Sequence, residues 1–495
     1  MVESNFAGRL VQKLGVCSQL MDAATGRGIR PEDLPRLIAA HGAALLATGL
    51  AEGDRILIGC SLSPASSLVY LGAIYAGLVA VPVEERTLLA SPGTLIEATG
   101  AKALWNEAGF REESRHQTVL RLEGDLVKDL DAVAPPTPRV ESDLAALMAT
   151  SGSTGVPRFV MVTHGNLISN TEAIIRSQRL DGEERAMLTL PVSYCFGASV
   201  MHTHLYQGGS VVFDRRFMFP DRVLEAISQF ECTTFAGVPT VYSVLLRRSN
   251  IRRIPMPSLR RFLQAGGALS RERIDEMRAT FPATKFYVMY GQTEATARIS
   301  CMDPERWKEK TGSVGQALDN LTISIVDEDG NEVCPGEIGE LLVKGPSVCS
   351  GYWNDSGETD RVFCDGWLRT GDLARRDEDG YLWIEGRKGA FLKIRGTRIS
   401  VAEVEQRVTA ISGVYECGAC SVEHPEAGEA LVLFVVPDNG TEIASDDVRR
   451  SLPAHWTLDS IHLVPELPKT TTGKIARLAL RALAQGARCS SSMKK

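Results

Sequence analysis

The segment whose residues are best suited to bind a ligand is Thr150–Arg158, which reads Thr-Ser-Gly-Ser-Thr-Gly-Val-Pro-Arg. Hydroxyl and backbone N–H groups in such a loop can wrap a polyphosphate, and the glycines let the backbone approach it closely. Apolar residues on both sides predict a strand, a hairpin and a second strand. The pattern is neither a Walker loop nor the turn of a serine nucleophile. Taken alone, the segment fits a phosphate loop or a plain turn.

A second candidate is Tyr290-Gly291-Gln292-Thr293-Glu294-Ala295, which follows the strand-like residues 286–289. An aromatic ring can stack on a base, the hydroxyl of Thr293 can bond a phosphate oxygen, and the carboxylate of Glu294 suits Mg²⁺. The same residues would also fit the end of a strand followed by a helix that Thr293 caps.

Three further polar turns carry candidate residues. Asp372, in Thr-Gly-Asp-Leu, could accept hydrogen bonds from two ribose hydroxyls. Arg387 follows a glycine and precedes the basic segment 393–398. Lys474 lies in a polar loop, 468–475, near the end of the chain, where a lysine is usually just solvated. Each of these turns is ordinary when taken alone.

The elements that must position these residues begin with alternating helices and strands. Over residues 34–83, and again over about 188–290, helical apolar spacing alternates with short apolar runs. This pattern predicts βαβ units on parallel sheets. Strands are expected over 55–59 and 80–83, with a helix between them.

The pattern of apolar residues and turns changes after that region. From about residue 321, short apolar runs alternate with Asp-Gly and Pro-Gly turns, which predicts antiparallel β structure, a small barrel or sheet. After Gly386, a last segment mixes a helix over 401–410, opened by Ser400 and Glu403, with a strand over 430–436. We therefore expect a separate small α+β domain at the end.

Composition narrows the classes of function. The chain has 495 residues, a net charge of −7 and no long basic run, which argues against nucleic acid as a partner. No stretch approaches the ~18 apolar residues of a membrane helix, so no stable membrane insertion is expected. Residues 1–15 mix charged and apolar residues, unlike a signal peptide. The eleven cysteines are scattered and odd in number, as in a reduced, cytoplasmic protein.

In this order and spacing, the five segments resemble the adenylate-forming superfamily of AMP-dependent synthetases and ligases, which includes acyl-CoA synthetases. The family pattern T-S-G-[ST]-T-G-x-P-K, Y-G-x-T-E, T-G-D, G-R and P-K-T-x-x-G-K is met almost throughout, and the resemblance covers about residues 34–481. It implies an α/β fold. A large N-terminal domain, residues 1–386, would contain two parallel-type αβ subdomains and a small β-barrel over about 321–386. A small mobile α+β domain would span 387–495.

The resemblance also implies an activity. The enzyme would use ATP and Mg²⁺ to convert a carboxylic acid to acyl-AMP with release of pyrophosphate. It would then transfer the acyl group to a thiol, that of CoA or of a carrier protein's phosphopantetheine. The implied partners are thus a small-molecule carboxylic acid and, as an alternative thiol source, an acyl carrier protein. Because the carboxylate and the α-phosphate are both anions, a metal ion and a lysine must offset their repulsion.

Roles follow for the matching residues. Thr293 would contact the α-phosphate, Glu294 would bind Mg²⁺, and Lys474 would bridge the carboxylate and the α-phosphate as the third catalytic residue. Tyr290 would stack on adenine, and Asp372 with Arg387 would hold the ribose. The set implied to bind nucleotide and cofactor is Thr150, Ser151, Gly152, Ser153, Thr154, Gly155, Gly266, Gly267, Ala268, Tyr290, Gly291, Gln292, Asp372, Arg387 and Lys393.

The family performs its two steps by rotating the C-terminal domain about a hinge near Gly386-Arg387. Lys474 would serve the first step, and the segment containing Lys393 would face the site in the second. The family usually has Asp or Lys two residues after the arginine, whereas this chain has Gly389. Glycine permits rotation but supplies no side chain, which leaves the rate of switching open. In the phosphate loop, Arg158 replaces the usual lysine and keeps its charge, and Phe159 replaces a glycine.

One position bears on the acid. Peptide-synthetase adenylation domains hold the amine of their substrate with an Asp, and Gly197 stands at that position here. A buried ammonium without a counter-charge would be costly, so we expect a fatty, aryl or other acid that is not an α-amino acid. Gly197, Val238 and Met289 are expected to line the pocket. The alternatives are a stand-alone enzyme that loads an amino acid on a carrier protein, a non-catalytic nucleotide sensor and a luciferase-like oxygenase.

Overall fold

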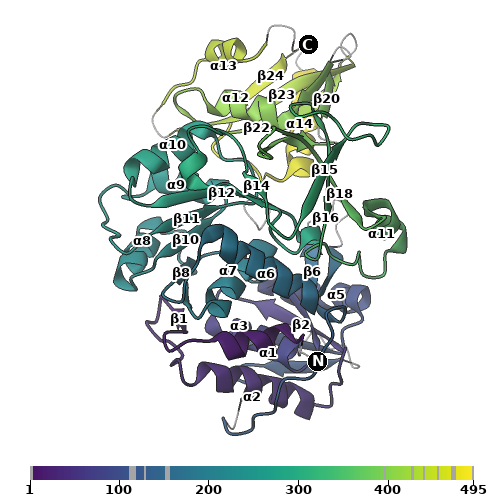
Figure 1. Ribbon diagram of the computed structural model, residues 1–495. Helices are drawn as coiled ribbons and strands as arrows, with labels where there is room; N and C mark the ends of the chain where they lie inside the picture. Colours follow the sequence, from purple (N-terminus) through teal and green to yellow (C-terminus); the bar gives the residue numbers. More distant parts are fainter. Residues whose placement is uncertain are drawn as a thin grey trace.

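The computed structural model describes residues 4–110, 119–127, 130–150, 157–388, 391–394, 397–424, 428–438, 441–453, 456, 458–469 and 475–492. The described residues form four sheets, two of them largely parallel and two largely antiparallel. In Figure 1 the N-terminal residues lie at the bottom, and the residues after 390 form a separate group of elements at the top. No helix among the described residues is long and apolar enough to cross a bilayer.

The first sheet has six strands in the order β5-β4-β2-β3-β6-β7, parallel except for the antiparallel pair β6–β7. Its central strand β2 buries both faces: Ile56 and Ile58 pack into one hydrophobic cluster and Leu57 into another, because successive side chains alternate in direction. The strands predicted over 55–59 and 80–83 are confirmed as β2 and β3. The strands are β2 (Arg55–Cys60), β3 (Val79–Glu84), β4 (Ala103–Asn106), β5 (Leu120–Glu123), β6 (Leu144–Thr150) and β7 (Arg158–Thr163).

The second sheet has eight strands in the order β1-β9-β8-β10-β11-β12-β13-β14. The strands are parallel from β1 to β12, and the last two pairs are antiparallel. This sheet contains the βα alternation predicted over 188–290. The strands are β1 (Leu20–Asp22), β8 (Arg185–Leu188), β9 (Ser210–Phe213), β10 (Thr234–Gly237), β11 (Arg261–Gln264), β12 (Lys285–Tyr290), β13 (Ser300–Cys301) and β14 (Gln316–Ala317).

Helices α6 and α7 connect these two sheets (Figure 1). Helix α6 packs on β6 and β7 of the first sheet, α7 packs on β8 and β9 of the second, and the two helices contact each other. One hydrophobic cluster therefore runs through both sheets. The helices of this part are α1 (Phe6–Lys13), α2 (Leu34–Ala47), α3 (Pro64–Tyr75), α4 (Glu85–Ala90), α5 (Pro92–Thr99), α6 (His164–Gln178), α7 (Cys195–Tyr206), α8 (Pro220–Gln229), α9 (Pro239–Arg248) and α10 (Arg271–Thr280), with short 3₁₀ turns η1 (Thr293–Ala295) and η2 (Pro304–Arg306).

The third sheet lies in the region predicted to be antiparallel. Its strands follow the order β15-β16-β18-β17, with β19 paired to β18. The predicted small barrel is therefore a half-barrel sheet in which, among the described residues, no pairing between β15 and β19 closes the circle. The elements are β15 (Thr322–Val326), β16 (Gly339–Lys344), α11 (Ser356–Val362), β17 (Phe363–Cys364), β18 (Trp367–Arg376) and β19 (Leu382–Arg387).

The fourth sheet forms the C-terminal part, whose two hydrophobic clusters contain only residues after 398. The predicted helix and strand are present as α12 and β23. Ser400 caps α12 by accepting a hydrogen bond from the backbone N–H of Glu403 at 3.4 Å. The elements are β20 (Phe391–Ile394), β21 (Thr397–Ser400), α12 (Val401–Thr409), β22 (Val414–His424), β23 (Gly428–Pro437), α13 (Ser445–Ser451), β24 (Leu458–Leu463) and α14 (Arg477–Ser492).

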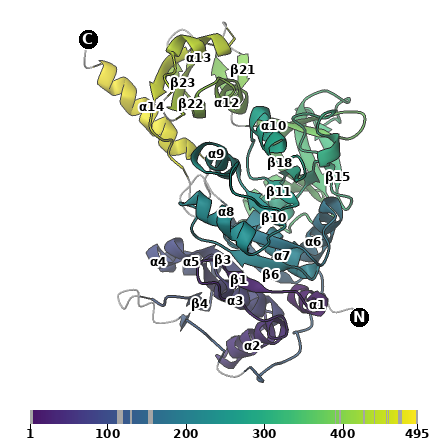
Figure 2. The same ribbon diagram turned by 90° about the vertical axis from the view of Figure 1, so that its left-hand side faces the viewer.

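The C-terminal part contacts α9 and α10 of the large part; Figure 2 shows these elements from the side. Arg273 of α10 donates hydrogen bonds to the hydroxyl of Ser243 and to the backbone carbonyl of Tyr415 at the start of β22. The guanidinium of Arg248 lies 4.7 Å from the centre of the Tyr415 ring, and Arg247 forms an ion pair with Asp438 at 3.2 Å. This interface fixes one arrangement of the two parts.

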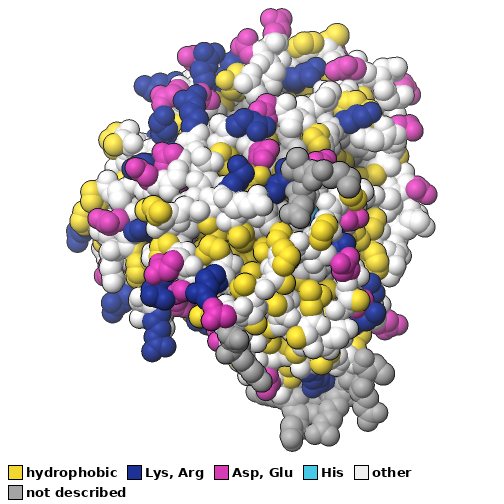
Figure 3. Space-filling model, turned by 60° about the horizontal axis from the view of Figure 1, so that its bottom comes forward, with side chains coloured by type: hydrophobic (Ala, Val, Ile, Leu, Met, Phe, Trp, Pro, Cys, Tyr) yellow, Lys and Arg dark blue, Asp and Glu magenta, His cyan; other side chains and the backbone are white. Residues whose placement is uncertain are grey.

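The surface carries mixed charge. On the face seen in Figure 3, Lys and Arg side chains are interspersed with Asp and Glu, and hydrophobic side chains gather between them. This face has no dense basic patch of the kind that binds a phosphate backbone.

Candidate active site

Three of the residues assigned to the nucleoside meet where β12 ends beside β18 and β19. The hydroxyl of Tyr290 donates a hydrogen bond of 2.6 Å to the carboxylate of Asp372, and Arg387 Nε lies 2.9 Å from the other oxygen of that carboxylate. Asp372 and Arg387 are direct partners in the β18–β19 ladder. Burial, and then the neighbouring carboxylate, raise the pKa of Tyr290 well above its usual value, so the phenol stays protonated.

Thr293 and Glu294 follow in the 3₁₀ turn η1. The hydroxyl of Tyr352 donates a hydrogen bond of 2.9 Å to Glu294 Oε1. The backbone N–H of Cys349 donates to the carbonyl of Glu294 at 2.9 Å, and the hydroxyl of Thr293 lies 3.5 Å from Cys195 Sγ. The segment 349–352 and the start of α7 therefore hold the turn in place.

Glu294 fits one mode of magnesium binding. Among the described residues, no group of three or more His, Cys, Asp or Glu side chains could form an all-protein metal site. Mg²⁺ instead commonly takes one or two carboxylates, keeps several waters and completes its shell with substrate phosphates. A single carboxylate fixed through one of its oxygens suits that arrangement.

Gln292 carries an orphaned polar atom beside this cluster. Its Nε2 is buried and meets no hydrogen-bond acceptor of the protein. A buried amide N–H without an acceptor is costly, so a ligand atom is the natural partner at this position. The donor set of Tyr290, Gln292 and Thr293 is thus compatible with a nucleotide.

The segment Gly266–Ala268 follows β11 and lies against two residues of other elements. A Cβ at Gly266, whose φ is +87°, would lie 2.6 Å from the hydroxyl of Tyr194 and 3.1 Å from Val238. A side chain would clash there and also strain the backbone. Val238 therefore lies against the Gly266 segment, and its predicted place in the acid pocket stays a prediction.

Gly197 and Met289 are placed differently. A Cβ at Gly197 would lie 2.3 Å from the carbonyl oxygen of Pro191 and 2.8 Å from that of Leu190, so this position packs against backbone. The sulfur of Met289 lies 3.2 Å from Nε2 of Gln178 on α6. The contacts of both residues therefore lie within the protein, and their predicted pocket roles stay predictions.

The two strands predicted on either side of the phosphate loop are present as β6 and β7, an antiparallel pair with Thr150 opposite Arg158. Residues Ser151, Gly152, Ser153, Thr154 and Gly155 lie outside the described residues. Arg158 forms ion pairs with Glu358 at 2.9 Å and Asp355 at 3.3 Å, and its guanidinium lies over the ring of Tyr352. It therefore links the loop to the segment that holds Glu294.

Lys474 and Gly389 also lie outside the described residues. Lys469 and Ile475, which flank the lysine loop, form a β-bridge, and Lys469 pairs with Glu416 at 3.0 Å. Lys393 lies on β20 opposite Arg398. Next to the hinge, Lys388 forms an ion pair with Glu340 at 2.7 Å. None of these contacts reaches the Tyr290 or Glu294 clusters.

Sequence reasoning missed three residues of the site. No motif in the sequence singles out Tyr352, and nothing in the sequence indicates that it contacts Glu294. Cys195 and Cys349 contact Thr293 and were read only as scattered thiols. Their side chains lack the charge or motif that would single them out, and only the fold brings them to the turn.

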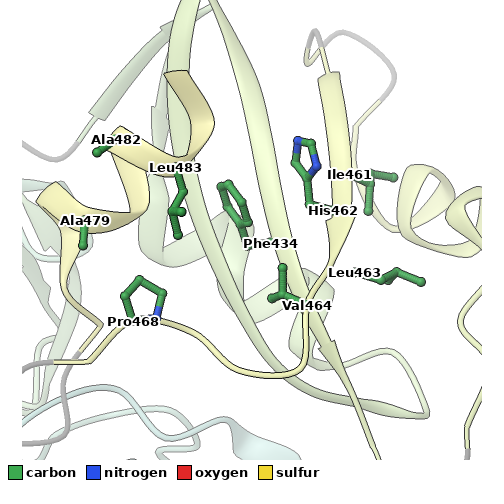
Figure 4. Close-up of a pocket in the computed structure, with 9 residues that line it drawn as sticks. All are labelled: Phe434, Ile461, His462, Leu463, Val464, Pro468, Ala479, Ala482 and Leu483. Atoms are coloured by element: carbon green, nitrogen blue, oxygen red, sulfur yellow. The ribbon is translucent and has the colours of Figure 1, made fainter. Parts of the chain in front are cut away.

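One apolar groove lies elsewhere. Figure 4 shows it between α14 and β24, with a volume of about 990 Å³. It is lined by Phe434, Ile461, His462, Leu463, Val464, Pro468, Ala479, Ala482 and Leu483. All of these belong to the C-terminal part, far along the chain from Thr293 and Glu294, and His462 is their only titratable side chain. The groove is therefore distinct from the candidate active site.

Comparison with known proteins identifies two matching family models. The model described as AMP-binding enzyme matches residues 32–353, and the model described as AMP-binding enzyme C-terminal domain matches residues 403–474. The first model alone spans more than half of the chain.

Individual proteins are similar over most of the chain. A feruloyl-CoA synthase of Amycolatopsis sp is 31% identical over 92% of this chain and 94% of its own length. A long-chain-fatty-acid–CoA ligase of Salmonella typhimurium is 34% identical over 70% of this chain and 63% of its own length. The crystal structure of ATP-bound MatB from Rhodopseudomonas palustris superimposes with a TM-score of 0.86 at 27% identity, covering 97% of this chain and 99% of that one.

Proposed function

This chain belongs to the AMP-binding enzyme family, within the adenylate-forming superfamily, and we propose that its site activates a carboxylic acid that is not an α-amino acid. The enzyme is an AMP-forming acid–thiol ligase. A carboxylate oxygen attacks the α-phosphorus of ATP, pyrophosphate leaves, and a thiol then attacks the acyl carbonyl and displaces AMP. The two relatives above are named for CoA ligation, which supports CoA as the thiol over a carrier protein's phosphopantetheine.

The observation that carries this proposal is the position of Glu294. Its carboxylate lies in the same turn as the hydroxyl of Thr293, directly after the strand whose last residue, Tyr290, bonds Asp372. The residues proposed to bind a cation, a phosphate and the nucleoside therefore occur within five residues of chain. Such an arrangement can fix the α-phosphate between a base-stacking ring and a metal ion.

Each remaining residue has a role in that scheme. Glu294 would hold Mg²⁺, which offsets charge on the phosphates when bound. Thr150 and the loop 151–155 would hold the β- and γ-phosphates, and the Gly266–Ala268 segment with Gly291 and Gln292 would surround the adenine. Lys474 would neutralise the attacking carboxylate. Asp372 would accept hydrogen bonds from the ribose hydroxyls, and Arg387 would donate hydrogen bonds to them.

The nature of the acid follows from Gly197. The Cβ position of residue 197 points at the carbonyl oxygens of residues 190 and 191. No acidic residue occurs between residues 188 and 209, so this segment supplies no counter-charge for a substrate ammonium. Fatty and aryl acids remain the favoured classes, with Val238 beside the Gly266 segment as a wall.

Rotation of the C-terminal part would separate the two steps. Lys474 would enter the site for adenylation, and the strand that carries Lys393 would replace it for thiol transfer. The hydrophobic clusters of the C-terminal part are self-contained, so it can move without losing its core.

The test is the detection of thioesters by mass spectrometry after incubation with ATP, Mg²⁺, CoA and a mixture of fatty, aryl and amino acids. Pyrophosphate exchange with each acid alone reports the first step. The proposal requires exchange and an acyl-CoA with at least one acid that lacks an amine. Exchange with an amino acid only would overturn it in favour of an enzyme that loads a carrier protein.

Lys474→Ala tests the mechanism. The variant should lose at least about 100-fold in acyl-AMP formation and keep most of its ATP affinity, because the lysine acts on charge that develops in the transition state. A nucleotide sensor would bind ATP equally well but would show no exchange in either protein. Normal adenylation by the variant would refute the role given to Lys474.

A further inference from the structure

Arg298 is a buried cation with no counter-charge among the residues that the structure describes. The residue lies between β12 and β13 and is only 2% exposed. Its Nε is buried without a hydrogen-bond partner, and among the described residues the guanidinium forms no ion pair or hydrogen bond. Burial is the main influence on its pKa and lowers it, yet a guanidinium keeps its proton in proteins.

The other buried arginines of the described chain are partnered. Arg261 forms a salt bridge with the fully buried Glu184. Arg273 donates hydrogen bonds to Ser243 and to the carbonyl of Tyr415. Arg298 is the most buried of the three, and no carboxylate is among the groups that act on it. Of these three buried arginines, Arg298 is thus the one without a partner among the described residues.

The contacts that Arg298 does make cannot balance the cost of its burial. Its guanidinium lies 4.9 Å from the centre of the Phe196 ring. A cation–π contact contributes about 0.5–2 kcal/mol, whereas an unpaired buried ion costs several kcal/mol. The remaining neighbours that influence its charge are Cys301, Cys195 and Tyr194. Burial raises the pKa of Cys301 to about 11, so this thiol is neutral at physiological pH.

The backbone holds Arg298 in place independently of its side chain. The buried side chain of Asn170 on α6 accepts a hydrogen bond from the N–H of Arg298 at 3.2 Å and donates one to its carbonyl at 2.9 Å. With the backbone clamped, the guanidinium is held beside the start of α7. A positioned, unsatisfied cation is a typical feature of a ligand site.

The neighbours of Arg298 connect it to the acid site. Three consecutive residues at the start of α7 contact different parts of the site. Tyr194 meets the Gly266 segment, Cys195 meets Thr293, and Phe196 meets Arg298. Thr293 marks the α-phosphate end. Cys195 is also among the groups that act on the charge of Arg298, so the guanidinium lies close to the proposed acid site.

We propose that Arg298 selects a carboxylic acid that bears a second anionic group at its far end, a dicarboxylic acid in the simplest case. This inference rests on the proposed function and narrows its class of acid. One carboxylate reacts at Thr293 and Glu294, and the second forms an ion pair with the guanidinium. A guanidinium presents parallel N–H groups that match a planar carboxylate, and Phe196 already covers one face of the group, so the ligand would approach the edge.

The test compares acids in pairs. Straight-chain dicarboxylic acids of increasing length and the benzenedicarboxylic acids are each measured against the monocarboxylic acid in which a methyl group replaces the second carboxyl. The wild-type enzyme should favour the best dicarboxylic acid over its partner by at least about 100-fold in kcat/KM, because the analogue leaves the guanidinium unpaired. A preference for the monocarboxylic partners would overturn the proposal.

Arg298→Met removes the charge and keeps most of the volume. The variant should lose at least about 100-fold in kcat/KM for the dicarboxylic acid, mainly through KM, and keep or improve its rate with the monocarboxylic partner. Arg298→Lys should retain part of the preference. An equal loss for both members of a pair would show that Arg298 acts on folding or on the reacting carboxylate instead.

Thermal unfolding gives a second readout that does not need turnover. Without acid, Arg298→Met should unfold at a higher temperature than the wild type, because an unpaired buried charge is removed. Arg261→Met, which leaves Glu184 unpaired, should unfold at a lower temperature and serves as the control. The preferred dicarboxylic acid should raise the unfolding temperature of the wild type and not that of Arg298→Met. A destabilised Arg298→Met protein would contradict the inference.

The two proposals can fail separately. If no acid of either kind supports pyrophosphate exchange, the proposed function fails, and the unfolding measurements still decide whether Arg298 binds a dicarboxylate. If exchange occurs with monocarboxylic acids only, the function stands and the assignment of Arg298 is wrong.

Discussion

At the scale of single residues, the proposed chemistry depends most on Glu294. Its carboxylate is held through one oxygen by Tyr352, which leaves the other oxygen for a cation. Asp372 is held from two sides by Tyr290 and Arg387. Both carboxylates are thus oriented by neighbouring donors before any ligand binds, which lowers the cost of ordering the site.

Tyr352→Phe tests that orientation. Without the hydroxyl, the Glu294 carboxylate loses its positioning bond, and we expect the Mg²⁺ concentration for half-maximal pyrophosphate exchange to rise about tenfold or more. Tyr242→Phe is a matched control, because it loses a buried hydroxyl bond to Leu263 in the core. An unchanged magnesium dependence in Tyr352→Phe would show that this bond is not needed.

At the scale of elements, helix α7 would supply one wall of the proposed acid site. Its first residues contact Thr293, Arg298 and the Gly266 segment, and its glycine packs on the loop that precedes it. The rest of the helix is buried between the two sheets. Changes in this helix should therefore affect both stability and the choice of acid.

Gly197→Ala probes the close packing of α7. The added methyl group would lie 2.3 Å from the carbonyl oxygen of Pro191, so the helix must shift. We expect a loss of about 1–3 kcal/mol in stability and a raised KM for the acid. Gly357→Ala in α11, where a Cβ would meet nothing within 4 Å, should be neutral or stabilising. Equal stability of both variants would refute the packing argument.

The histidines of this region predict a dependence of stability on pH. Burial lowers the pKa of His202 to about 3, and the pKa of His164 and of His204 to about 4. These side chains are neutral when folded and take up protons on unfolding below about pH 6.5. Stability should therefore fall as the pH decreases from about 6.5 toward 4.

Measurement of the unfolding midpoint between pH 7.5 and 4.5 checks this dependence. Each buried histidine contributes a slope of up to about 1.4 kcal/mol per pH unit inside the window. His202→Phe keeps a ring between Phe6 and Tyr70. The slope of stability against pH should fall by the contribution of the one proton that His202 takes up on unfolding. An identical slope in the variant would contradict the assignment of His202.

At the scale of the whole molecule, Tyr415 anchors the C-terminal part on α9 and α10. Its carbonyl accepts from Arg273, and its ring lies under Arg248. The next residue, Glu416, pairs with Lys469 beside the loop that contains Lys474. The proposed rotation of the C-terminal part would have to break the contacts that Tyr415 makes with α9 and α10.

Arg273→Met weakens the anchor. We expect pyrophosphate exchange to fall about tenfold or more, while transfer from preformed acyl-AMP to CoA is spared, because only the first step needs this arrangement. Arg271→Met on the same helix, whose partner Asp275 is 3.6 Å away at the surface, is the control. An equal loss in both steps would indicate general destabilisation instead.

The amino-acid sequence by itself determined the family, the activity and the order of the elements. Motifs such as Tyr290–Glu294 depend on neighbouring residues, and strands such as β2 depend on a short apolar pattern. Both can therefore be recognised in the sequence alone. The pocket role that the sequence suggested for Gly197 stays a prediction, because that position packs against backbone carbonyls.

Only the tertiary structure decided which side chains touch. Tyr352 reaches Glu294 across 58 positions and Tyr290 reaches Asp372 across 82, and no local pattern encodes such distances in the chain. The unpaired state of Arg298 is likewise a property of its surroundings. An arginine looks the same in a sequence whether or not a carboxylate lies beside it, and burial without a partner exists only once the chain has folded around it.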